Sequence, residues 1–231
     1  MPINGFNKTT LLDYPGKIAS TIFLGGCNFR CPFCQNSSLV LSPNKQPVIS
    51  TEEVLSVLKK RQGILEGVCI TGGEPTLDKD LFLLIDKIKE LGYPVKLDTN
   101  GSHPWILKKL VNNQMIDMVA MDIKSSKESY AKVSGCKNID LTSICESVEF
   151  LLSNVIPYEF RTTVVRELHD KSDFESIGKW IAGCQAYHLQ AYRDSPDVIH
   201  PGYSSYTRAE LEQFRQILLR TISSVSIRGI D

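Results

Sequence analysis

The sequence has no excess of charge of either sign, because its 231 residues include 26 Lys and Arg and 26 Asp and Glu. It therefore offers no overall electrostatic attraction to nucleic acid or to an anionic membrane, and neither is expected as a partner. The sequence also lacks a run of about 18 apolar residues, and its start lacks a basic stretch followed by an apolar one. We therefore expect a cytoplasmic protein.

No segment rich in proline, glycine and serine divides the chain, so we predict one domain over residues 1–231. The seven cysteines are an odd number, and a chain of this size can bury a core without covalent crosslinks. Both facts disfavour a disulfide framework. The cysteines are therefore expected either to bind a metal or to be buried as free thiols.

Short runs rich in Val, Ile, Thr and aromatic residues alternate with helix-like segments along the whole chain. The expected strands are 18–24, 67–71, 94–98, 117–123, 158–164 and 186–190. Three capping boxes, each a hydroxyl residue followed three positions later by glutamate, predict helix starts. They are Ser50 with Glu53, Ser172 with Glu175, and Thr207 with Glu210.

Six strand-then-helix units require parallel strands joined by right-handed crossovers. A closed barrel needs eight such units, and only six are counted. The sequence therefore predicts an α/β fold, an incomplete (β/α)6 TIM-like barrel with parallel strands and outer helices. In such a fold the functional residues follow the C-terminal ends of the strands.

Three cysteines follow the first expected strand, where Cys27, Cys31 and Cys34 form a C-x3-C-x2-C pattern. Three reactive thiols so close together are unusual unless they bind a metal ion or a cluster. A structural zinc site takes four ligands, and no second pair of cysteines follows. An iron–sulfur cluster is also ordinarily held by four thiolates. The other cysteines are dispersed, so one iron of such a cluster would lack a protein ligand.

Polar residues also follow the next strands. Gly72, Gly73 and Glu74 come after the second strand, and two glycines allow the backbone to approach a ligand closely. The same residues could form a plain turn before a helix. Asp98 and Thr99 end the third strand.

The fourth and fifth strands add charged residues. Asp122 and Lys124 end the fourth strand, and they could be a solvated ion pair at the rim. Arg161 lies inside the fifth strand, where an unpaired guanidinium would be costly. We therefore expect Arg161 to pair with an acidic residue or with a bound carboxylate.

The C-x3-C-x2-C loop resembles that of the radical S-adenosylmethionine (SAM) enzymes. The resemblance implies a [4Fe–4S] cluster held by Cys27, Cys31 and Cys34, with SAM chelating the open iron. It also implies that an electron from the cluster breaks a C–S bond of SAM and gives a 5′-deoxyadenosyl radical. No catalytic side chain beyond the cluster and the cofactor is expected.

The other motifs resemble family segments too, and they imply roles for single residues. Phe33 would lie against the adenine, and Glu74 in GGEP would pair with the ammonium of SAM. LDTNG and MDIK resemble segments of the glycyl-radical-enzyme activases. The match implies that Asp98, Thr99 and Asp122 line the SAM ribose or a nearby cation site and that Lys124 faces the SAM carboxylate. The cofactor-binding candidates are Phe33, Gln35, Gly72, Gly73, Glu74, Asp98, Thr99, Asp122, Lys124 and Arg161.

The stretch KTTLLDYPGKIASTIFLGGCNFRCPFCQN most resembles the activating proteins of anaerobic ribonucleoside-triphosphate reductases. Pyruvate formate-lyase activases are near relatives. The resemblance implies a large glycyl radical enzyme as protein substrate and flavodoxin or ferredoxin as electron donor. Two alternatives stay open. One is a radical SAM enzyme acting on a small molecule, such as a 7-carboxy-7-deazaguanine synthase, and the other is a non-catalytic iron–sulfur protein.

Overall fold

The computed structural model describes residues 2–230, which form two compact units. The first unit contains the residues up to Asn28, Ser38–Thr99 and His103–Ala120. The second contains Phe29–Ser37, Asn100–Ser102 and the residues from Met121 onward. Each unit is thus assembled from segments that are distant in the sequence.

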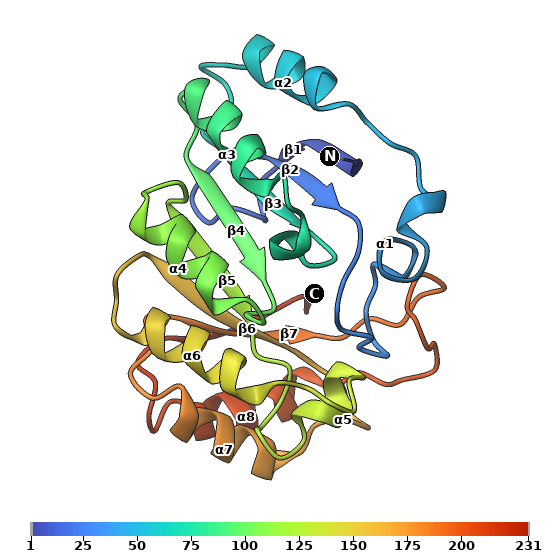
Figure 1. Cartoon of the computed structure of the whole chain (residues 1–231). Coiled ribbons are helices and arrows are strands. Elements are labelled where there is room, and N and C mark those ends of the chain that lie inside the picture. Colours follow the sequence, from blue (N-terminus) through green and yellow to red (C-terminus); the bar gives the residue numbers. More distant parts are fainter. Residues whose placement is uncertain (1, 231) are drawn as a thin grey trace. The chain divides into compact units, whose positions relative to one another are not determined.

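The first unit contains four strands, β1 (Ile3–Thr10), β2 (Ala19–Leu24), β3 (Gly67–Gly72) and β4 (Val95–Thr99) (Figure 1). Strand β1 is antiparallel to β2, whereas β2, β3 and β4 are parallel. Its helices are α1 (Ser37–Leu41, of which Ser37 falls in the second unit), η1 (Pro43–Lys45), α2 (Thr51–Lys60), η2 (Pro75–Leu77), α3 (Leu81–Glu90) and α4 (Pro104–Asn112). Strand β5 (Met118–Asp122) begins here, after the amide of Asp117 donates to the carbonyl of Val95 (2.8 Å).

The core of the first unit follows from its apolar pattern. Leu81, Leu84, Ile85 and Ile88 lie on one face of α3 and are buried, as the helical period predicts. The helix stops before Gly92, whose φ of +83° is left-handed and favours glycine. The first four residues of β3 are all buried, so both faces of the strand are covered. This is typical of parallel strands.

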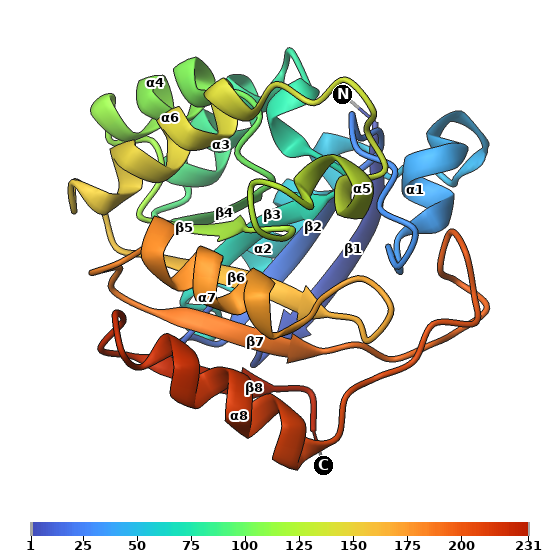
Figure 2. The same cartoon turned by 90° about the horizontal axis from the view of Figure 1, so that it is seen from below.

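The second unit contains β6 (Tyr158–Val164), β7 (Tyr187–Ala191) and β8 (Val225–Arg228), which are parallel. Its helices are α5 (Tyr130–Ser134), α6 (Leu141–Leu152), α7 (Lys171–Trp180) and α8 (Arg208–Leu218). Helices α7 and α8 lie along the strands (Figure 2), and Phe174 stacks on Phe214 between them with ring centroids 4.5 Å apart. The end of β5 reaches this unit, where the amide of Ile123 donates to Arg161 (2.8 Å).

All six predicted strands are present within one residue of their expected bounds, and the α/β class with parallel strands and intervening helices is confirmed. Two strands were missed. The polar sequence of β1 hides its pairing with β2, and β8 has only four residues. The capping boxes before α2 and α8 have their predicted N-caps, but α7 begins earlier, with Asp170 and Asp173 as its capping box. No helix formed by residues 2–230 is long and apolar enough to cross a membrane.

Candidate functional site

The residues that follow β3, Gly73 and Glu74, hold the start of the cysteine loop in the first unit. The amide of Gly73 donates to the carbonyl of Leu24 (2.9 Å), and that of Glu74 donates to Gly26 (2.8 Å). A Cβ on Gly73 would overlap the carbonyl oxygen of Gly26, and it would lie 3.3 Å from the Cβ of Cys27. The lack of a side chain at Gly73 therefore lets the chain after β3 come close to the backbone just before Cys27.

Glu74 is buried at the start of η2, with 1% of its surface exposed. Its Oε1 accepts hydrogen bonds from the amide of Thr76 (3.2 Å) and from the hydroxyl groups of Thr76 and Thr99. The Thr99 bond is 2.7 Å long. Two predicted site residues, Glu74 and Thr99, are thus brought together, and the carboxylate is held in one orientation.

Asp98 is paired with a lysine that sequence reasoning overlooked. Lys96, two residues earlier on β4, is only 1% exposed and its Nζ contacts Oδ1 of Asp98. The Cys69 sulfur on β3 lies 3.6 Å from the same oxygen. A lysine inside the apolar strand sequence PVKLD was the signal, because a buried ammonium requires an acidic partner.

The second unit holds the rest of the cysteine loop by main-chain hydrogen bonds. The amide of Cys34 donates to Cys31 (3.0 Å), which forms a turn, and the carbonyl of Cys34 accepts from Ile199 (3.2 Å). The amide of Arg30 donates to Ser134 at the end of α5 (2.9 Å). Gly135 follows with a φ of +69°, and a Cβ there would overlap the carbonyl oxygen of Arg30. The path of the loop is therefore fixed by backbone contacts.

Phe33 and Gln35 have structural partners in this unit. Phe33 is buried and meets the His169 ring edge-on, with centroids 6.5 Å apart. Gln35 donates from Nε2 to the carbonyl of Arg193 (2.9 Å). These contacts explain the positions of both side chains without a bound cofactor. The cofactor roles predicted for Phe33 and Gln35 therefore stay predictions.

Asp122, Lys124 and Arg161 form one cluster at the ends of β5 and β6. Lys124 Nζ lies 2.9 Å from one carboxylate oxygen of Asp122, and Arg161 lies 3.0 Å from the other. Burial alone would raise the pKa of Asp122, but the two cations lower it to about 2. Burial would lower the pKa of Lys124, but Asp122 and the Cys31 sulfur raise it. The acidic partner expected for Arg161 is therefore Asp122.

A second buried charge cluster lies beside the first and was not predicted. Glu159 on β6 is 3% exposed at its side chain and pairs with Arg228 on β8 through both oxygens (3.1 and 3.0 Å). His188 on β7 lies 3.1 Å from the same carboxylate. The three residues sit on neighbouring parallel strands. The signal that could have found them is a titratable residue in each of the three strand sequences.

The donor set of the cysteine loop fits an iron–sulfur cluster. Its thiols are soft ligands of the kind that clusters require. Cys31 is buried, and its sulfur interacts electrostatically with the Lys124 ammonium. Within residues 2–230 no three His, Cys, Asp or Glu side chains already stand in metal-ligand geometry. The fit therefore rests on the chemistry and spacing of the donors.

Residues 21–181 match the radical SAM superfamily. A protein of Methanocaldococcus jannaschii named as a glycyl-radical enzyme activating enzyme is 32% identical over 99% of this chain and 96% of its own length. A domain of a pyruvate-formate lyase-activating enzyme from Bacteroides vulgatus has a TM-score of 0.58 at 19% identity, over 71% of this chain and 99% of that one. SuiB of Streptococcus suis bound to S-adenosylmethionine has a TM-score of 0.69 at 13% identity, over 90% and 52%.

The fold and the cysteine loop are those of a radical SAM enzyme, a class that uses a [4Fe–4S] cluster and SAM, and the incomplete (β/α)6 barrel predicted from the sequence is the fold of this class. The chain belongs to the radical SAM superfamily and, within it, to the glycyl-radical enzyme activating enzymes. The resemblance of the sequence to radical SAM enzymes and to glycyl-radical-enzyme activases is thereby confirmed.

Replacing Gly135 by alanine should displace the cysteine loop. The left-handed φ costs about 1 kcal/mol or more for alanine, and the new Cβ also collides with the Arg30 carbonyl. Gly183→Ala is the matched control, because its φ is +78° and no atom lies within 4 Å of the added Cβ. We expect Gly135→Ala to lose both more unfolding free energy and more bound iron after anaerobic reconstitution than Gly183→Ala. Equal losses in the two variants would contradict the role of Gly135.

Replacing Glu159 by glutamine should destabilise the fold in a pH-dependent way. Burial opposes ionisation, but His188 and Arg228 lower the pKa of Glu159 below that of the unfolded chain. Its ionisation therefore stabilises the fold above the unfolded pKa of about 4.3, and this stabilisation is lost as the pH falls through the folded pKa. Urea unfolding should show a loss of about 3 kcal/mol at pH 7, narrowing towards pH 3. The exposed Glu175, 3.8 Å from Lys171, provides the control Glu175→Gln, which should match the parent chain at both pH values. A Glu159→Gln deficit that is independent of pH would refute the ion pair.

Proposed function

We propose that this radical SAM enzyme generates a glycyl radical on a large partner protein, namely anaerobic ribonucleoside-triphosphate reductase. The observation that carries the proposal is the similarity to a glycyl-radical enzyme activating enzyme along 99% of this chain. The resemblance of the first part of the sequence to the reductase-activating proteins favours this reductase among glycyl radical enzymes. We propose that residues 1–231 act as one radical SAM domain.

In this proposal Cys27, Cys31 and Cys34 would hold a [4Fe–4S] cluster, and SAM would bind at the iron that has no protein ligand. When bound, the two groups would supply the electron-transfer and radical chemistry needed to remove a hydrogen atom from the target glycine. The chain itself contributes thiolate ligands, orientation of SAM and exclusion of water. Flavodoxin or ferredoxin would supply the electrons.

Two groups of side chains would orient SAM. The buried, ionisable Glu74 is held by Thr76 and Thr99, which suits it to accept hydrogen bonds from the SAM ammonium. Lys124 and Arg161 carry two positive charges against the one carboxylate of Asp122. The surplus positive charge of this cluster suits the SAM carboxylate. Asp98 and Asp122 would lie near the ribose or a cation.

The test is to incubate the anaerobically reconstituted chain with dithionite, SAM and the reductase from the same genome, and to record the electron spin resonance spectrum. We expect a glycyl radical doublet and stoichiometric 5′-deoxyadenosine. Cys34→Ala should abolish both the doublet and SAM cleavage, whereas Cys145→Ala, which removes a half-buried thiol from α6, should retain them. SAM cleavage stimulated by a small heterocycle, with no doublet on the reductase, would instead favour a small-molecule enzyme. No cleavage at all would favour a non-catalytic iron–sulfur protein.

Replacing Glu74 by glutamine should weaken SAM binding without changing the iron content. Glutamine keeps an oxygen acceptor for Thr76 and Thr99 but removes the charge, and a charge-assisted hydrogen bond of about 1.5–3 kcal/mol corresponds to a loss in affinity of about tenfold or more. Isothermal titration of the cluster-loaded chain with SAM measures this effect. Glu90→Gln, at the exposed end of α3, is the control of equal charge. Unchanged SAM affinity in Glu74→Gln would remove Glu74 from the proposed site.

A further inference from the structure

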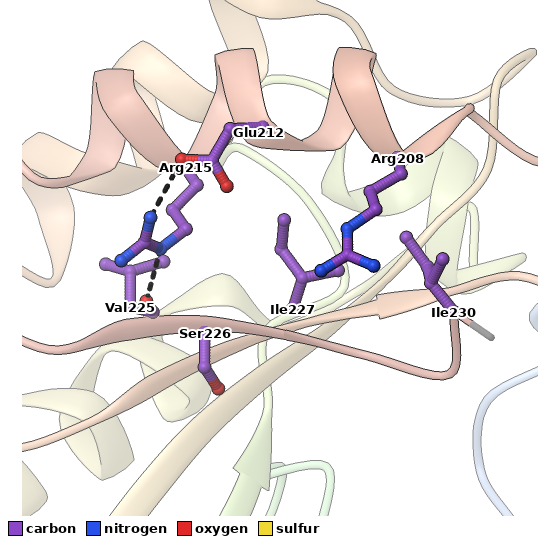
Figure 3. A pocket seen from close by; sticks show the side chains of 7 residues that line it. All are labelled: Arg208, Glu212, Arg215, Val225, Ser226, Ile227 and Ile230. Atoms are coloured by element: carbon purple, nitrogen blue, oxygen red, sulfur yellow. Dashed lines mark hydrogen bonds and ion pairs between the residues drawn. The ribbon is translucent and has the colours of Figure 1, made fainter.

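A pocket of about 310 Å³ lies between α8 and β8 in the second unit (Figure 3). It is separate from the residues proposed to bind the cluster and SAM. Its lining consists of Arg208, Glu212, Arg215, Val225, Ser226, Ile227 and Ile230. The pocket therefore combines charged side chains from a helix with the backbone and apolar side chains of a strand.

The main-chain groups of β8 that face this pocket belong to alternate residues. The amide of Tyr187 on β7 donates to the carbonyl of Ser224 (2.9 Å), and Tyr187 is in register with Val225. In a parallel ladder the polar groups of Ser224 and Ser226 therefore point to β7, and those of Val225 and Ile227 point away from it. Arg215 bears this out, because its Nε donates to the carbonyl of Val225 (2.8 Å). Strand β8 ends the sheet formed by the described residues, so the amide and carbonyl of Ile227 face its open edge.

The two arginines of the pocket differ in the groups that their side chains contact. Arg215 is held by the Val225 carbonyl and by Glu212 (2.8 Å). The Arg208 side chain reaches down from α8 towards Ile227 and Ile230, and no hydrogen bond or ion pair joins it to another of the residues drawn in Figure 3. With Glu212 balancing one arginine, the lining carries one surplus positive charge.

We propose that this edge docks an extended acidic segment of the protein substrate. The segment adds a strand beside β8, exchanges main-chain hydrogen bonds with Ile227, and places an aspartate or glutamate carboxylate against Arg208. This inference rests on the proposed function, because it assigns a binding surface to the partner protein that the function requires.

Two properties of the pocket favour a peptide segment over a small anion. A free carboxylate would use only Arg208, whereas a strand also satisfies the amide and carbonyl of Ile227. Ile227 and Ile230 offer apolar surface beside the charge, which suits the alternating side chains of an extended segment. Arg228, on the same strand, pairs with Glu159 on β6, whose carboxylate also interacts with Arg161. The docking edge is thus joined to the candidate SAM residues of this unit.

The experiment measures the dissociation constant of the cluster-loaded chain for the purified reductase, by anaerobic sedimentation, in three variants. Arg208→Glu reverses the charge inside the pocket, and Arg220→Glu makes the same change at an exposed position just beyond α8. Ile227→Pro removes an amide that points to the open edge, a place where strands tolerate proline. Iron content and the thermal midpoint check that each variant folds.

We expect the dissociation constant to rise about tenfold or more in Arg208→Glu and in Ile227→Pro. It should stay within about twofold in Arg220→Glu. Unchanged binding in Arg208→Glu would overturn the docking surface, even if Ile227→Pro fails to fold. Unchanged binding in a folded Ile227→Pro would overturn the strand addition. A dimer of the chain alone that Arg208→Glu separates would assign the edge to a second copy instead.

The parent chain separates this outcome from a failure of the proposed function. If it produces a glycyl radical on the reductase while Arg208→Glu binds as tightly, only the docking surface is wrong. If the parent chain neither binds the reductase nor gives the radical, the proposed function fails, and the docking proposal fails with it.

Discussion

Burial of charge inside parallel strands is the constraint on which the candidate site depends. Strands covered on both faces leave little water for a charged side chain, so each charge needs a partner nearby. Three groups satisfy this need, namely Lys96 with Asp98, Asp122 with Lys124 and Arg161, and Glu159 with His188 and Arg228. In the Asp122 group two cations face one carboxylate, whereas Glu159 and Arg228 balance each other.

The same arrangement explains why the side chains are oriented before any ligand arrives. Glu74 accepts hydrogen bonds from Thr76 and Thr99. Asp122 forms ion pairs with Lys124 and Arg161 through its two carboxylate oxygens. A ligand that binds such groups has little side-chain entropy left to remove. Rigid strands and a backbone-anchored loop thus provide precision, while the chemistry is left to the cofactors that the superfamily uses.

The sequence predicted the parts of this structure that depend on local pattern. Buried strands and the residues at their ends were readable, because apolar runs and polar ends are properties of neighbouring residues. Strand β1 was not readable, because its polar residues join the sheet only through pairing with β2. The partners of Glu159 were missed because they lie on other strands. Lys96 was missed although its partner Asp98 lies only two residues further along the same strand. The role of Phe33 could not be predicted either, because an aromatic residue in a motif can equally pack against another side chain, as Phe33 packs against His169.

Main-chain hydrogen bonds hold the cysteine loop in the second unit. The carbonyls of Pro32 and Cys34 accept from His200 and Ile199, and the amide of Arg30 donates to Ser134. These main-chain bonds do not depend on what the thiols of the loop carry. Oxidative damage to a bound metal group would then strip the prosthetic group while leaving its cradle folded, so that repair requires new iron and sulfide but no new polypeptide.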